Sequence, residues 1–126
     1  ASLNKIKTAM ERIVAGTCQA AGASYEFSFK NTFHSTINNP DQTTKAIKAA
    51  QAVFGAENVV ADCVPLTISE DFSSMLRVKP GCYALIGNGT GTVGGCALHN
   101  PKYDFNDRIL SKGAEYWVQL AEDILG

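Results

Sequence analysis

The stretch that decides the fold of this chain is Pro80-Gly81-Cys82-Tyr83-Ala84-Leu85-Ile86-Gly87. The Pro-Gly pair ends the helical pattern before it, and residues 82–86 are apolar on both faces. Such a run is typical of an interior strand that is covered from both sides. The stretch therefore predicts a buried strand in a layered protein.

Segments on its N-terminal side alternate between helical and strand patterns. Apolar side chains at helical spacing predict a helix over residues 3–21 that Gly22 ends. Residues 25–33 alternate apolar and polar side chains, which predicts a strand with one buried face. After the break at Asn38, Asn39 as cap and Pro40 as first helical residue predict a second helix, which ends at Gly55.

The C-terminal side continues the alternation. We expect a strand over residues 59–64, a short helix capped by Ser69, and a last helix over residues 107–125. The predicted core face of the last helix consists of Ile109, Leu110, Ala114, Trp117, Val118, Ala121 and Leu125. Alternating helices and strands favour the α/β class. Since one strand has a single covered face and another has two, we expect two sheets, with the chain crossing between two bodies near Asn38.

Composition excludes several classes of function. The chain has 126 residues, 45% of them hydrophobic, and a net charge of −1. No run of Lys or Arg suggests a nucleic-acid partner, and no apolar run approaches membrane-spanning length. The four cysteines lack paired CxxC spacing, and the N-terminal segment is amphipathic rather than signal-like. We therefore expect a cytoplasmic protein with one core and free thiols.

His99 is the candidate metal ligand. It stands on a predicted turn, between a glycine-rich loop and the last helix, where a proline turn would hold the imidazole exposed. A working zinc site takes three or more protein ligands, so His99 predicts only part of a site. His34 follows the end of a predicted strand, and we expect it to be solvated or to support a neighbouring residue.

Two further patterns have structural explanations. Glu70 and Asp71 lie at the predicted start of a helix, where carboxylates complement the helix dipole. The glycines at 89, 91 and 94 fit a dinucleotide-binding turn, but the residues after Gly94 cannot form the helix that this turn needs, and no acidic residue follows at the ribose position. We interpret residues 89–94 as a mobile loop beside a site and keep nucleotide binding as a third alternative.

Four segments in order resemble the metal-dependent N-acyl-amino-acid amidohydrolases, the group of hippurate hydrolase and the indole-acetyl-amino-acid hydrolases. They are Thr36 to Pro40, Ser69 to Phe72, Pro80 to Gly87, and Leu98 to Asp107. The resemblance implies an α/β protein in which residues 1–35 are the end of a small α+β lid or dimerisation domain. It implies that residues 36–126 are the C-terminal segment of a zinc-peptidase-like catalytic domain.

The resemblance also implies roles for single residues. His99 becomes the C-terminal ligand of a divalent metal (zinc, manganese or cobalt), and Asn38 a residue that contacts the N-acyl amino acid substrate. Glu70 and Asp71 become supporting residues that border the cleft. His34 stands where the family often has proline and receives no role. The lid implies a homo-oligomer.

The family's other ligands and its general base lie upstream, in a CGHD-type motif and a glutamate pair that this sequence lacks. We therefore expect this chain to be inactive alone and to act as part of a longer amidohydrolase. The alternative is a structural or interaction module, in which His99 does no chemistry and the apolar face of the helix over residues 3–21 forms a dimer.

Overall fold

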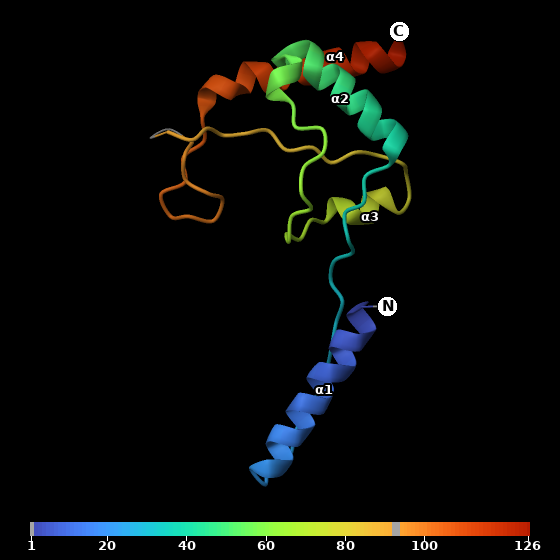
Figure 1. The fold of residues 1–126 in the computed structure, drawn as a ribbon, viewed down its shortest axis with the longest axis vertical. Coiled ribbons are helices and arrows are strands. Elements are labelled where there is room, and N and C mark those ends of the chain that lie inside the picture. The colour runs from blue at the N-terminus through green and yellow to red at the C-terminus, as the bar shows by residue number, and fades with distance from the viewer. Residues whose placement is uncertain (1, 92–93) are drawn as a thin grey trace. The chain divides into compact units, whose positions relative to one another are not determined.

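The computed structural model describes residues 2–91 and 94–126, and the chain divides into two compact units (Figure 1). The first unit comprises residues 1–32 and the second comprises residues 33–126. Every candidate site residue belongs to the second unit. Within the described residues, no helix is long and apolar enough to cross a membrane.

The first unit is built on helix α1, Ser2–Ala20. The helix ends in a Schellman motif, in which the N–H of Ala23 donates to the carbonyl of Cys18 at 2.9 Å and that of Gly22 to Gln19 at 3.1 Å. Gly22 has a φ of +67°, a left-handed conformation that glycine adopts without strain. The helix and its predicted glycine stop are confirmed.

Helix α2, Pro40–Phe54, begins and ends where the sequence predicts. The side chain of Asn39 accepts a hydrogen bond from the N–H of Gln42 at 3.1 Å, and Pro40 is the first helical residue. The N–H of Asn39 donates to the carbonyl of Gly81 at 2.9 Å, which ties the start of α2 to the predicted strand region. A short 3₁₀ turn, η1 (Ala56–Asn58), follows.

Helix α4, Leu110–Leu125, packs against α2, as Figure 1 shows. A 3₁₀ turn, η2 (Asp107–Ile109), leads into it, with Asn106 as its cap. Ala49 is fully buried and Ala46 nearly so, and the rings of Phe54 and Tyr116 lie 6.4 Å apart between centroids. Small side chains on α2 let the two helices approach closely, and Ala46 and Ala49 are the buried apolar residues among those described.

The face of α4 that we predicted to be buried is largely exposed. Trp117 is 67% exposed and Leu125 84%, and Leu110 and Val118 are also exposed. The half-buried residues of α4 include Tyr116 and Leu120 instead. The helix carries apolar residues on more than one stripe, and α2 covers only one of them. Amphipathic spacing therefore identified the helix but not the face in contact.

Helix α3, Phe72–Leu76, forms where the sequence predicts a short helix, but the predicted cap is wrong. Asp71 occupies the N-cap position in helical backbone geometry, without a side-chain cap bond. Ser69 stays exposed. Glu70 reaches the N–H of Phe72 at 3.5 Å, a long contact that replaces the expected serine cap.

The three predicted strands, over residues 25–33, 59–64 and 82–86, are not formed in the described parts of the chain. A strand exists only where its N–H and C=O groups pair with a neighbouring strand, and these segments have no such neighbour here. One isolated bridge joins Gly91 and Gly94. The patterns therefore marked segments suited to a sheet, while the pairing itself is missing among the described residues.

Candidate functional site

The loop that carries His99 consists of two consecutive turns. In the first, the N–H of Asn100 donates to the carbonyl of Ala97 at 3.2 Å, with His99 at the third position. In the second, the N–H of Tyr103 donates to the carbonyl of Asn100 at 2.9 Å, and Pro101 occupies the second position, which suits its fixed φ. The side chain of Asn100 also accepts from the N–H of Lys102 at 2.8 Å.

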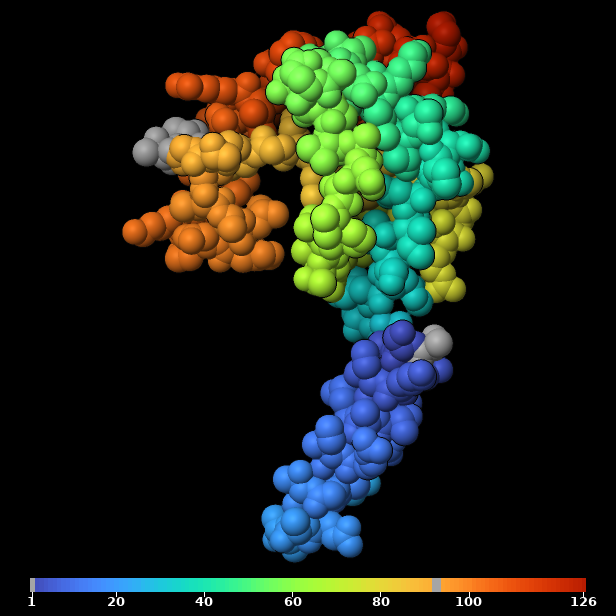
Figure 2. All heavy atoms as spheres, in the orientation of Figure 1, coloured from blue at the N-terminus to red at the C-terminus, as the bar shows by residue number. Residues whose placement is uncertain are grey.

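His99 has a φ of +69°. Among the described residues, it is the one residue other than glycine whose φ is positive. Histidine is among the residues that tolerate this left-handed conformation. The side chain is exposed, and the loop stands out as a lobe of its own in the space-filling view (Figure 2). The predicted exposed turn is confirmed, and an imidazole held in this way is accessible to a partner.

The amide of Asn88 holds this loop closed. Its nitrogen donates to the carbonyl of Gly94 at 3.3 Å and to that of Asp104 at 2.8 Å. Its oxygen accepts from the N–H of Asn106 at 2.9 Å. One side chain therefore joins the start of the loop to its end, and sequence reasoning missed it. The only signal was a polar residue between two glycines, directly after an apolar run.

Gly94 has to be glycine because its backbone lies against that of Asn88. Its φ is +75°, and a Cβ at this position would lie 1.8 Å from the carbonyl oxygen of Asn88. The described residues after Gly94 form turns rather than the helix that a dinucleotide-binding turn requires. Thr92 and Val93, which belong to the glycine-rich motif, lie outside the described residues.

Asn38 lies in a second cluster, on the main chain of Tyr83. The amide nitrogen of Asn38 donates to the Tyr83 carbonyl at 2.9 Å, and its oxygen accepts from the Tyr83 N–H at 2.8 Å. This pair imitates one rung of a β ladder and fixes the residues before α2 to the predicted interior strand. Asn38 therefore has a structural task, and its contact with substrate stays a prediction.

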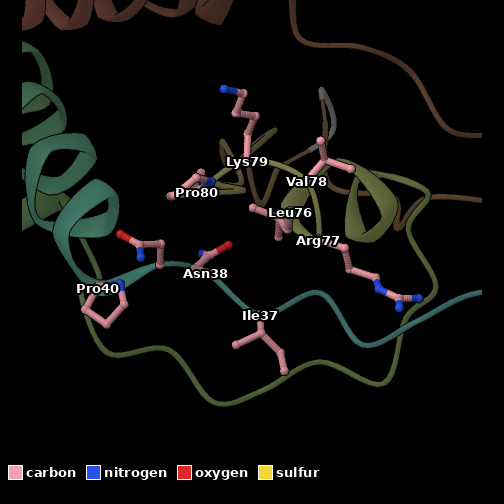
Figure 3. A pocket seen from close by; sticks show the side chains of 10 residues that line it. Ile37, Asn38, Pro40, Leu76, Arg77, Val78, Lys79 and Pro80 are labelled. Atoms are coloured by element: carbon pink, nitrogen blue, oxygen red, sulfur yellow. The ribbon is translucent and has the colours of Figure 1, made fainter.

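A hollow of about 420 Å³ lies beside Asn38, between residues 37–40 and residues 76–81 (Figure 3). Its lining includes Lys79 and Arg77, whose charged side chains extend in different directions. A nitrogen of Arg77 lies 2.6 Å from Nε2 of His34. Because arginine only donates hydrogen bonds, this nitrogen of His34 is the acceptor in the contact.

Glu70 and Tyr83 form the other polar pair of this cluster. The Tyr83 hydroxyl donates to Oε2 of Glu70 at 2.8 Å, and the Tyr83 ring lies 5.5 Å from that of Phe72. The hydrogen bond from Tyr83, followed by that from Asp71, lowers the pKa of Glu70, while the bond to Glu70 raises the pKa of Tyr83. A carboxylate with a lowered pKa is a weak base, so this geometry suits an anchoring role.

A complete metal site is not formed by the residues that the structure describes. No group of three or more His, Cys, Asp or Glu side chains comes together among them. An exposed imidazole fits a divalent metal as one donor, and a zinc site needs at least two more protein donors. His99 can therefore contribute to a metal site and cannot form one from these residues.

A family model described as "Peptidase family M20/M25/M40" matches residues 4–123, which is nearly the whole chain. The chain belongs to this peptidase family. Membership of the M20 family implies an α/β peptidase fold and a hydrolytic enzyme, and enzymes of the family generally depend on a divalent metal. The resemblance to amidohydrolases is confirmed, and the segments that suit a sheet agree with this fold class.

Relatives of this M20 chain include hippurate hydrolase of Campylobacter jejuni, which is 31% identical over 87% of the chain and 28% of its own length. Thermostable carboxypeptidase 1 of Saccharolobus solfataricus is 31% identical over 94% of the chain and 30% of its own length. An IAA-amino acid hydrolase of Arabidopsis thaliana is 32% identical over 71% of the chain and 20% of its own length. No solved structure matches. The chain thus spans less than a third of these relatives.

Proposed function

We propose that residues 1–126 form the C-terminal part of a longer, metal-dependent amidohydrolase that cleaves the amide bond of N-acyl amino acids such as hippurate. The observation that carries the proposal is the exposed imidazole of His99 on its doubly turned loop, in an M20 chain whose described residues bring no group of three or more His, Cys, Asp or Glu together. Relatives named for hippurate and for IAA-amino acids support this substrate class.

In this proposal, residues 1–35 end the lid domain, through which the enzyme forms a homo-oligomer, and residues 36–126 close the catalytic domain. The exposed stripe of α4 and the apolar segments over 59–64 and 82–86 then pack against the rest of that domain. The two apolar segments support this arrangement because their sequence patterns suit a sheet, while neither segment pairs with a strand among the described residues.

His99 has one role in the proposed reaction: its loop presents the imidazole as the last protein ligand. His99 would help to hold a divalent metal in the whole enzyme, where that ion would supply activation of water and polarisation of the substrate carbonyl. Asn38, which is tied to Tyr83, lies at the edge of the hollow and contacts substrate through its remaining hydrogen-bonding capacity. Glu70 and Asp71 border the cleft, where Glu70 holds Tyr83 in place.

The experiment is to express the full reading frame that contains these residues and to measure hippurate hydrolysis with added zinc, manganese or cobalt. We expect hydrolysis by the wild-type protein and a fall in kcat/KM of at least about a hundredfold for His99→Ala, since loss of a ligand removes metal from the site. His34→Ala is the matched control, because His34 is an exposed histidine in the same unit, and it should leave kcat/KM within about threefold.

A near-normal kcat/KM in the His99→Ala variant would remove His99 from the metal site and defeat the proposal. An upstream Cys-Gly-His-Asp motif in the same reading frame would support it. We also expect the 126-residue chain alone to show no hydrolysis with any of the three metals, because it lacks the general base.

The alternative function is a structural module that dimerises through α1. One observation favours it: the apolar residues Leu3, Ile6, Met10 and Ile13 recur at helical spacing and are exposed. Sedimentation equilibrium of the 126-residue chain tests it. A dimer that Ile6→Glu dissociates, together with a reading frame that ends at these residues, would favour the module over the enzyme.

A further inference from the structure

Asn88 stands just outside the loop that carries His99, and it makes more side-chain hydrogen bonds to this loop than any other described residue. Its two N–H groups are directed to two different carbonyls, Gly94 before His99 and Asp104 after it. Its oxygen accepts a hydrogen bond from the N–H of Asn106, and the side chain of Asn106 caps the 3₁₀ turn before α4. All three bonds join backbone groups that no helix or sheet would otherwise satisfy.

The bonds of Asn88 matter because they hold both ends of the loop, while the backbone of Gly95 lies against that of Gly91 at its start. Among the described parts of the chain, the backbone hydrogen bonds within residues 95–103 are those of the two turns around Asn100, so the position of His99 depends on how the ends of the loop are fixed. Closing a loop of this length costs entropy, and a side chain that ties both ends restricts the conformations that the imidazole can reach. Metal ligands need placement within about 0.5 Å to bind well.

We infer that Asn88 is a positioning residue that sets the location of the His99 imidazole for metal binding. The inference rests on the proposed function, in which His99 is a ligand. The chemistry requires an amide at this position: an aspartate could accept from Asn106 but could not donate to the two carbonyls. Asn88 touches neither metal nor substrate in this inference, and it acts only through the loop.

The test uses the whole enzyme and cobalt(II) as the probe, because the d–d absorption of bound cobalt reports on the metal site independently of turnover. We expect Asn88→Ala to raise the dissociation constant for cobalt about tenfold, the effect typical of residues that orient metal ligands. Hydrogen exchange of the backbone amides of residues 94–106 should become faster in the same variant. Should Asn88→Ala fail to fold, Asn88→Asp keeps one of the three bonds and is expected to change both readouts in the same direction.

The matched control is Asn58→Ala. Asn58 also donates from its amide to a main-chain carbonyl, that of Phe54 at 2.8 Å, but it lies in η1 and outside the loop. We expect this variant to change neither cobalt affinity nor exchange over residues 94–106. An effect on cobalt as large as that of Asn88→Ala would mean that any lost amide bond loosens the site, and the inference would fail.

His99→Ala separates failure of this inference from failure of the proposed function. If His99→Ala weakens cobalt binding while Asn88→Ala leaves it unchanged, His99 is a ligand and Asn88 does not position it. If wild type and His99→Ala bind cobalt with equal affinity, the ligand role fails, and the inference about Asn88 fails with it.

Discussion

Single asparagine residues carry much of the organisation of this chain. Asn38 pairs with the main chain of Tyr83, Asn39 caps α2, Asn88 closes the His99 loop, and Asn106 starts the turn before α4. An amide both donates and accepts, so it can replace a missing backbone partner. Among the described residues the predicted strands lack neighbours, and Asn38 supplies one pairing of the kind that a sheet would supply.

Tyr83→Phe tests the Glu70–Tyr83 pair. Removing the hydroxyl removes the main cause of the lowered pKa of Glu70, so we expect this pKa to return toward the ordinary value of 4.5. Carbon-13 NMR titration of the side-chain carboxyl of Glu70 measures it. Tyr25→Phe is the control, and an unchanged Glu70 pKa in Tyr83→Phe would contradict the assigned cause.

The same pair predicts how stability depends on pH. The pKa of Glu70 is lower in the folded chain, so its stabilisation is present above pH 4.5 and is lost as the pH falls through the folded pKa. The pKa of Tyr83 is raised above 10.0, so its stabilisation is present below that pH and is lost as the pH rises through the folded value. Urea unfolding should show both losses in wild type and smaller ones in Tyr83→Phe.

At the scale of elements, helix ends are better specified by the sequence than helix faces. Local bonds between residues close in the chain define the start of α2 and the end of α1. The face of α4 that contacts α2 depends on a neighbour far away in the chain, which spacing alone does not identify.

Asn39→Ala tests the cap of α2. The substitution removes the acceptor for the N–H of Gln42, and we expect the free energy of unfolding to fall by about 1 kcal/mol. Asn39→Asp keeps a carboxylate acceptor at the positive end of the helix and should retain stability within about 0.5 kcal/mol. Urea unfolding followed by circular dichroism gives both values, and equal losses in the two variants would argue against capping.

For the molecule as a whole, exposed apolar surface outweighs the buried core. Among the described residues, the buried apolar side chains are those of Ala46 and Ala49, while large side chains such as Trp117 stay in contact with water. A chain of this length has enough residues for one packed core, and here the apolar residues are present without being enclosed. The proposed remainder of the catalytic domain would enclose them.

Trp117→Ser tests whether another part of a longer protein covers α4. In the 126-residue chain, where Trp117 is 67% exposed, we expect the free energy of unfolding to change by less than about 0.5 kcal/mol. In the whole enzyme, we expect a loss of about 3 kcal/mol, as for a buried tryptophan. Gln119→Ser, a polar change on the same helix, is the control. Equal small effects in both proteins would mean that this stripe of α4 stays uncovered.

The sequence by itself determined the family, the positions of the main helices, the cap of α2, the glycine stops of α1 and α2, and the turn that exposes His99. These features depend on backbone conformations and hydrogen bonds between residues a few positions apart. Only the tertiary structure decided that Asn88 closes the loop, that Asn38 pairs with Tyr83, and which face of α4 meets α2. Each of these depends on a contact between residues that are far apart in the chain, and the spacing of residues along the sequence does not predict such contacts.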